Sequence, residues 1–163
     1  MKKGHLIAFL SLMILNTSLN AKLSIELFTV TDKKSSVGNV VFEDTDYGLL
    51  ITPNFHSLKP GLHGFHLHEN PSCDQQGQAA GDHFDPQKTN KHLGPYNVNG
   101  HLGDLPALYV NEQGKATLVI LAPRLTVEDI KGAIVIHEGG DNYADSPESL
   151  GGGGKRIACG VNT

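Results

Sequence analysis

Two histidines one residue apart in the stretch GFHLHEN, residues 64–70, constrain the fold more than any other feature of the sequence. Side chains alternate between the two faces of a β-strand. A strand here would therefore place His66 and His68 on one face, and Phe65 and Leu67 on the other. Two steps of strand rise would separate the histidine Cβ atoms by roughly 6.5–7 Å. The stretch predicts a strand whose two imidazoles can reach one metal ion.

Short segments with strand character recur along the chain, separated by turns rich in Gly, Pro, Asn and Asp. The expected strands are residues 23–30, 39–44, 48–53, 64–70, 107–110, 115–122, 133–139 and 156–161. The one helix-like piece is residues 126–130, about one turn with Thr126 as its N-cap. This pattern predicts an all-β fold, an antiparallel β-sandwich or barrel.

Two long stretches, residues 69–106 and 138–155, have no clear periodicity. Loops this long are uncommon in compact domains unless they are functional or disordered. The first stretch gathers three histidines and several aspartates, which a disordered tract would hardly do. We infer that a bound metal supplies the order that hydrophobic burial cannot.

The metal-ligand residues divide into two sets. Three imidazoles and one carboxylate in the first long stretch suit a tetrahedral zinc site without an open position. These residues are His83, His92, His101 and Asp104. A second, all-nitrogen site can form from His66, His68 and His137 on the expected strands. Imidazole ligands suit copper, zinc or nickel, so the residue types leave the second metal open.

The N-terminal residues 1–21 have the order of a secretory signal peptide: basic Lys2 and Lys3, an apolar run, and a polar patch before Ala21. The apolar run is too short for a membrane span, and a buried N-terminal helix is the alternative. Cleavage after Ala21 would leave residues 22–163 as one domain.

The charge and the cysteines narrow the class further. The chain has 13 basic and 17 acidic residues, a net charge of −4, and loss of Lys2 and Lys3 leaves 11 against 17, or −6. A net acidic domain without a basic run argues against nucleic acid as a partner. The two cysteines, Cys73 and Cys159, suit one disulfide in an exported chain, with two buried thiols as the alternative.

Several motifs in a fixed order carry a family resemblance over about 100 residues. They are GFHLHEN, GDHFDP, KHLGPY, GHLGDLPALYVN, APRL, IHEGGDNYAD and LGGGGKRIACGV. Together they closely resemble the copper/zinc superoxide dismutases of the bacterial periplasmic type. The resemblance implies a Greek-key, immunoglobulin-like β-sandwich or barrel with two long functional loops. It also implies an oxidoreductase that converts superoxide to dioxygen and hydrogen peroxide by alternating reduction and oxidation of copper.

The resemblance assigns a role to each matching position. It implies one copper ion on His66, His68, His83 and His137, and one zinc ion on His83, His92, His101 and Asp104. His83 would bridge the two ions and act with Arg156 as a catalytic residue, Arg156 attracting the anionic substrate. Asp141 would orient a ligand of each ion, and Cys73 and Cys159 would form the disulfide. His63, which has the opposite strand parity to His66, would support the site without binding metal.

The resemblance also sets expectations about partners. It implies superoxide as substrate, a periplasmic location protecting the cell envelope, and no membrane attachment of the mature form, and leaves monomer and homodimer both open. An anionic substrate conflicts with the charge of −6 unless Arg156, Lys155 and Lys88 or Lys91 make a locally positive channel. Two other functions remain to be separated by experiment: a non-catalytic metal carrier on the same fold, and a zinc hydrolase with an open site.

Overall fold

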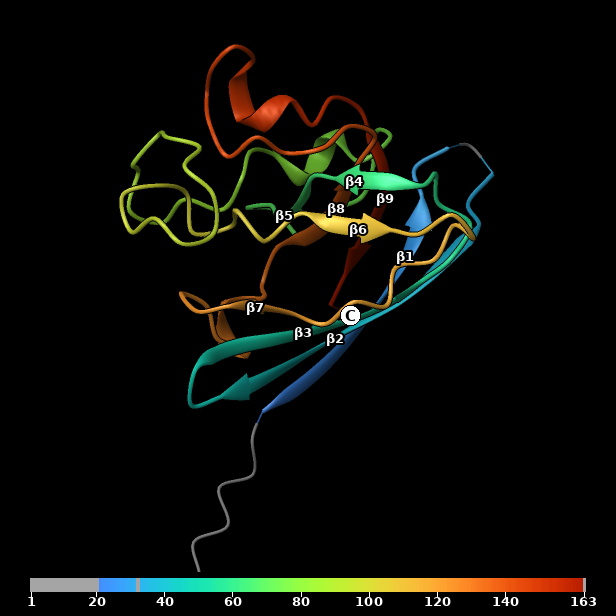
Figure 1. The fold of residues 1–163 in the computed structure, drawn as a ribbon, viewed down its shortest axis with the longest axis horizontal. Coiled ribbons are helices and arrows are strands. Elements are labelled where there is room, and N and C mark those ends of the chain that lie inside the picture. The colour runs from blue at the N-terminus through green and yellow to red at the C-terminus, as the bar shows by residue number, and fades with distance from the viewer. Residues whose placement is uncertain (1–20, 32, 163) are drawn as a thin grey trace, which may run out of the picture.

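The computed structural model describes residues 21–31 and 33–162, and the expected signal peptide lies outside this range apart from Ala21. The described chain is built from nine β-strands and three short 3₁₀ turns (Figure 1). The strands are β1 Lys22–Thr29, β2 Ser36–Thr45, β3 Gly48–Phe55, β4 Gly61–His63, β5 Phe65–Leu67, β6 Leu108–Val110, β7 Ile120–Ala122, β8 Ala133–His137 and β9 Arg156–Val161. The turns are η1 Gln78–Ala80, η2 Val127–Asp129 and η3 Ser149–Gly152.

Seven strands form one curled antiparallel sheet in the order β5-β8-β9-β1-β2-β3-β7, and β4 pairs with β6 in a second, two-stranded sheet. β1, β2 and β3 pair as neighbours along the chain, whereas β9 returns to lie beside β1 and β8 beside β5. The prediction of an all-β antiparallel fold is confirmed.

Alternation along the first strands builds the core. Ile25 and Leu27 of β1 are buried while their neighbours are more exposed, and Val40 and Phe42 of β2 are fully buried. The register pairs Ile25 with Val40, so the apolar side chains of the two strands fall on the same face. This face packs against the equivalent residues of β3, β5 and β8 in one core cluster.

The strand boundaries differ most from the sequence expectation in one segment. The segment expected as a strand over 115–122 is a strand only at β7, Ile120–Ala122, with an isolated bridge from Ala116 to Phe55. Leu118 lies between these pairings with 61% of its surface exposed, so alternation alone overestimated the pairing there. The expected helical turn is η2, which follows Thr126 as N-cap.

The two long stretches lie on the same side of the sheet, next to β5 and β8 (Figure 1). Both remain mostly irregular, as the sequence predicted, with η1 in the first and η3 in the second. A disulfide between Cys73 and Cys159 ties the first stretch to β9, across 86 residues of sequence. In the described part of the chain, no helix has the length and hydrophobicity needed to cross a membrane.

Two glycines allow β5 to pack closely against its neighbours. A Cβ atom at Gly132 would lie 1.7 Å from the carbonyl oxygen of His68, and one at Gly103 would lie 2.2 Å from that of Leu67. Backbone occupies both places, so neither position has room for a side chain. These glycines fix how deeply the histidine strand sits in the fold.

We expect Gly132→Ala to displace the backbone at His68 and to lower the free energy of unfolding by about 3 kcal/mol. Urea denaturation of the metal-free protein measures this effect. Gly140→Ala is the matched control, because its Cβ would be 3.6 Å from the nearest atom, an ordinary contact. Equal stability of the two variants would contradict the packing argument.

Candidate metal centre

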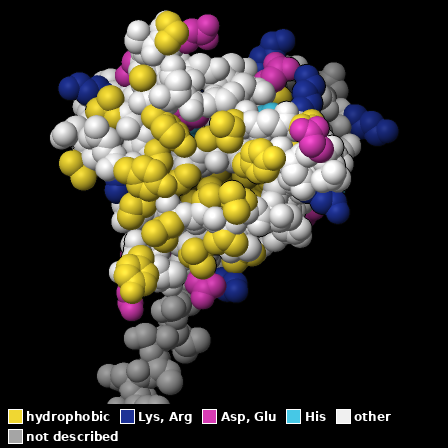
Figure 2. Space-filling view, viewed as in Figure 1, with side chains coloured by type: hydrophobic (Ala, Val, Ile, Leu, Met, Phe, Trp, Pro, Cys, Tyr) yellow, Lys and Arg dark blue, Asp and Glu magenta, His cyan; other side chains and the backbone are white. Residues whose placement is uncertain are grey.

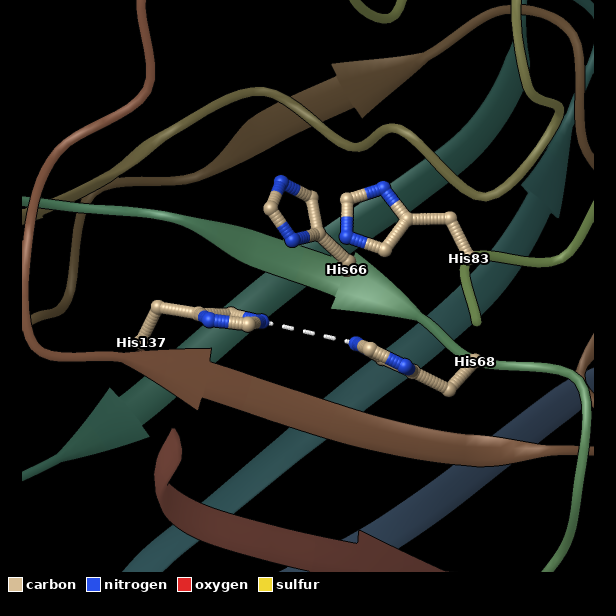
Figure 3. A group of neighbouring side chains, drawn as sticks. All are labelled: His66, His68, His83 and His137. Carbon is tan, nitrogen blue, oxygen red and sulfur yellow. Dashed lines mark hydrogen bonds between the residues drawn. The ribbon is translucent and has the colours of Figure 1, made fainter. Parts of the chain in front are cut away.

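Four buried histidines from different parts of the chain meet at one point. His66 lies in β5, and His68 is the first residue after that strand. His137 is the last residue of β8, and His83 comes from the first long stretch. Their exposed fractions are 0%, 1%, 7% and 3%, respectively. Figure 3 shows the four rings turned toward one another, with His68 Nε2 and His137 Nε2 3.4 Å apart. The four can offer nitrogen atoms that all lie within 4.8 Å of one another.

A second cluster converges on one carboxylate oxygen. The Nδ1 atoms of His83, His92 and His101 lie 2.9, 3.0 and 3.3 Å from Asp104 Oδ1. Ligands of a tetrahedral zinc ion at about 2.0–2.1 Å are separated by roughly 3.3 Å. The spacing of these four atoms is therefore close to that of a zinc site. His83 belongs to both clusters.

Backbone donors hold the Asp104 carboxylate in place. The peptide N–H groups of Leu93 and Gly94 donate to its Oδ2 atom over 3.2 and 3.3 Å, which leaves Oδ1 facing the histidines. The carboxylate is fully buried. Its orientation is thus set by the same loop that supplies His92.

Asp141 connects the two clusters. His66 Nε2 donates to its Oδ2 atom over 2.8 Å, and His92 Nε2 donates to its Oδ1 atom over 2.7 Å. The N–H of Tyr143 donates to Oδ1 and restrains the carboxylate further. One carboxylate therefore fixes the orientation of a ring in each cluster.

The hydrogen bonds to Asp141 decide which nitrogens remain free. A neutral imidazole that donates through Nε2 has an unprotonated Nδ1, which is a lone pair available to a metal. Nδ1 of His66 and Nδ1 of His92 are both buried without a hydrogen-bond partner. The lone pair of His92 faces the Asp104 oxygen 3.0 Å away, an arrangement that requires a cation between them. Both clusters therefore fit metal ions on an observation independent of residue type.

The pKa values of the histidines agree with this reading. Burial and the neighbouring His83 lower the pKa of His66 to about 3, and burial lowers the pKa of His137 to about 4. Burial also lowers the pKa of His68 and His83. Burial opposes protonation of His92, but the neighbouring carboxylates of Asp104 and Asp141 raise its pKa to about 9. The first cluster is thus kept neutral, as metal ligands must be, whereas the second attracts positive charge.

Arg156 stands beside the first cluster. A hollow of about 320 Å³ is lined by His68, His83, His137 and Arg156, and Glu148 also lines it. The Arg156 guanidinium donates to the carbonyl oxygens of Gly77 and Gly81. The Gly81 oxygen also accepts from His68 Nδ1 over 2.9 Å.

The charges around the hollow differ from the sequence expectation. Among the described residues that line it, Arg156 is basic, while Asp82 and Glu148 are acidic. Lys155 and Lys91 do not line it, and Lys88 lines a separate hollow that also contains His101. Among the described residues, Arg156 is therefore the one Lys or Arg that lines the hollow beside the first cluster.

The structure brings together the metal-ligand residues expected from the sequence, with Asp141 between them, and it places His63 outside both clusters. His63 is buried, and its two nitrogens contact the carbonyl oxygens of His137 and Lys59 over 2.7 and 2.8 Å. Sequence reasoning missed Asp145, whose carboxylate accepts from the N–H groups of His92 and Leu150. No motif signals this role, because it depends on how two loops meet.

Comparison with known proteins agrees with the geometry. The family model described as copper/zinc superoxide dismutase matches residues 36–162. The chain belongs to the copper/zinc superoxide dismutase family. It is 49% identical to the superoxide dismutase [Cu-Zn] of Photobacterium leiognathi over 77% of this chain and 78% of the relative, and 46% identical to that of Legionella pneumophila over 99% of each.

A solved structure extends the comparison to the fold. The Cu/Zn superoxide dismutase from Brucella abortus is 42% identical, with a TM-score of 0.82 over 88% of this chain and 100% of that one. The fold is thus that of the copper/zinc superoxide dismutases, a family of oxidoreductases that act on superoxide. The family binds copper and zinc, and the two clusters fit these metals.

The lowered histidine pKa values predict that the metal-free dismutase loses stability as the pH falls below about 6.5. Above that pH His66 and His137 are neutral in both the folded and the unfolded state. Below it the unfolded chain takes up protons that His66 and His137, with pKa values of about 3 and 4, do not accept when folded. The unfolded state then binds more protons, so stability falls by about 1.4 kcal/mol per pH unit for each such histidine.

Urea midpoints of the metal-free protein between about pH 7 and pH 4 measure this loss. His56→Gln is the control, because His56 is exposed on a loop away from the clusters and should leave the curve unchanged. A midpoint that stays constant over this range would contradict the prediction.

Proposed function

We propose that this chain is an exported superoxide dismutase in which His83 bridges a copper ion and a zinc ion. The observation that carries the proposal is the membership of His83 in both four-residue clusters. With His83 Nδ1 facing Asp104, the Nε2 atom is left for the cluster of His66, His68 and His137. Copper would bind this all-histidine cluster, and zinc would bind the cluster that contains Asp104.

Copper, when bound, supplies the one-electron redox change that superoxide dismutation needs and that zinc lacks. The reaction converts two superoxide anions and two protons into dioxygen and hydrogen peroxide. The residues of the chain supply orientation, charge and a proton. Asp141 would keep the rings of His66 and His92 aimed, and His83 would hold a proton on Nε2 for the peroxide product.

Arg156 would attract and hold the substrate anion. Its guanidinium keeps its positive charge at any physiological pH. Two backbone carbonyls fix it at the wall of the hollow, beside His68 and His137. Because steering depends on the local field and not on the total charge, one fixed cation here can act although the chain is acidic overall.

We also propose that residues 1–21 are a signal peptide and that the mature domain acts in the periplasm, where it protects the cell envelope. The disulfide between Cys73 and Cys159 supports an oxidising compartment. The bacterial origin of the similar dismutases supports the same location.

A homodimer would use the face shown in Figure 2, where hydrophobic side chains gather. Leu62 of β4 and Tyr109 of β6 pair in register, and 57% and 50% of their surfaces are exposed. Exposed apolar patches of this kind are typical of interaction surfaces. We propose that this face supports self-association, with the monomer as the alternative.

Reconstitution of the full chain with copper and zinc tests the function. We expect one copper and one zinc per chain, Cu(II) absorption, and catalytic removal of superoxide. His66→Ala should retain zinc but lose copper, with activity reduced more than about 100-fold. His56→Gln is the matched control and should behave as the wild type.

Two outcomes would contradict the proposal, and each indicates another function. Transfer of bound metal to an acceptor without turnover of superoxide would indicate a metal carrier. Activity on a hydrolysable substrate with zinc alone would indicate a zinc hydrolase.

Arg156→Ile should lower the rate constant for superoxide about 10-fold and weaken its dependence on ionic strength, because the local attraction for the anion is lost. Arg156→Lys, which keeps the charge, should lie between this variant and the wild type. Lys115→Ile removes an exposed charge from the turn after β6 and serves as control. Pulse-generated superoxide decay at several salt concentrations measures the rates. Equal rates for the Arg156 and Lys115 isoleucine variants would refute the steering role.

A further inference from the structure

Arg124 lies on a rigid part of the barrel. It sits between β7 and η2, next to Leu125, which has 2% of its surface exposed and belongs to the core cluster. The N–H of Val127, at the start of η2, donates to Asp44 of β2 over 2.8 Å. The backbone around Arg124 is therefore fixed to the sheet on both sides.

The Arg124 side chain reaches from this segment into the first long stretch. Its Nη2 atom donates to the carbonyl oxygen of Gly100 over 2.8 Å, and its Nη1 atom donates to those of His101 and Gly94 over 3.1 and 3.4 Å. The intervening residues 95–99 are mostly exposed. One guanidinium thus binds both ends of an exposed excursion of the chain.

The three acceptors are closely connected to the zinc-type cluster. His101 is itself a member, and Gly94 follows two residues after His92. The carbonyl oxygen of Gly94 accepts from Arg124, and the N–H of the same residue donates to Asp104 Oδ2. A shift of this backbone would therefore move three of the four members of this cluster, namely His92, His101 and Asp104.

The positive charge of Arg124 is matched by its surroundings, which include two carboxylates and several carbonyl oxygens. Burial lowers its pKa, and the nearby carboxylates of Asp104 and Asp85 oppose that shift. Its planar fork can donate to several carbonyl oxygens at once, which a lysine ammonium cannot do with the same geometry. The carbonyl oxygens that it binds lie outside the strands, and no backbone N–H of the described residues donates to them.

We propose that Arg124 is a positioning residue for zinc: it clamps the loop that carries His92, His101 and Asp104 to the barrel and so preorganises the zinc site. This inference rests on the proposed function of that cluster. Arg124 touches neither the ion nor the substrate. It acts through the backbone, by keeping the loop in the geometry that zinc requires before the ion arrives.

Zinc titration of the metal-free full chain, in competition with a chelator, tests the proposal. We expect Arg124→Met to weaken zinc binding about 10–100-fold, the range found when groups that support metal ligands are removed. Copper binding to the all-histidine cluster should change less than about 3-fold. Arg124→Lys should give an intermediate loss of zinc affinity, since one ammonium replaces the fork.

Lys131→Met is the matched control, because it removes an exposed positive charge from the segment just after η2. It should leave zinc affinity unchanged. A merely structural role for Arg124 would lower the unfolding midpoint of metal-free and zinc-loaded protein equally and leave zinc affinity at the wild-type value. That result would overturn the proposal.

The outcomes separate this inference from the proposed function. Should Arg124→Met not fold, Arg124→Lys decides, and wild-type zinc affinity in that variant would overturn the clamp. A wild-type chain that binds no zinc would overturn the proposed function and the clamp together. If the wild type binds zinc and both Arg124 variants bind it with the wild-type affinity, the clamp alone is overturned.

Discussion

The convergence of three imidazoles on one oxygen of Asp104 is the constraint on which the site depends. A buried carboxylate facing the lone pair of His92 at 3.0 Å is stable only with positive charge between them. A proton can satisfy this need, as the raised pKa of His92 indicates, and a metal ion satisfies it with all four groups at once. The long irregular stretch is thus organised around a charge, where a hydrophobic core organises the rest of the chain.

The sheet and the two loops contribute to the site in different ways. The sheet provides a rigid frame through alternating apolar side chains, and it positions His66 and His137 on paired strands. The loops bring the remaining ligands to that frame, held by the disulfide, by Asp141 and by Arg124. These three attachments contact the loops at different points. The loops are therefore ordered although they contain little regular structure beyond η1 and η3.

Much of this could be predicted from sequence, because the strongest signals are local. Alternation predicted that His66 and His68 point to the same side of a strand. The motifs grouped the two sets of ligand residues that the structure brings together. The partial loss of strand over 115–122 could not be predicted, since pairing depends on what lies beside the strand. Asp145 and Arg124 were likewise not assigned, because their partners are backbone atoms distant in sequence. Periodicity and motif spacing carry no information about such contacts.

The carbonyl oxygen of Gly81 accepts from both His68 and Arg156. A single peptide unit therefore links the position of His68, a proposed copper ligand, to that of Arg156, the cation proposed to attract the substrate. A change in the loop that moved this peptide would alter metal geometry and anion capture together. Substitutions that alter the attraction for an anion without moving a metal ligand are therefore expected at other residues that line the hollow, such as Asp82 and Glu148.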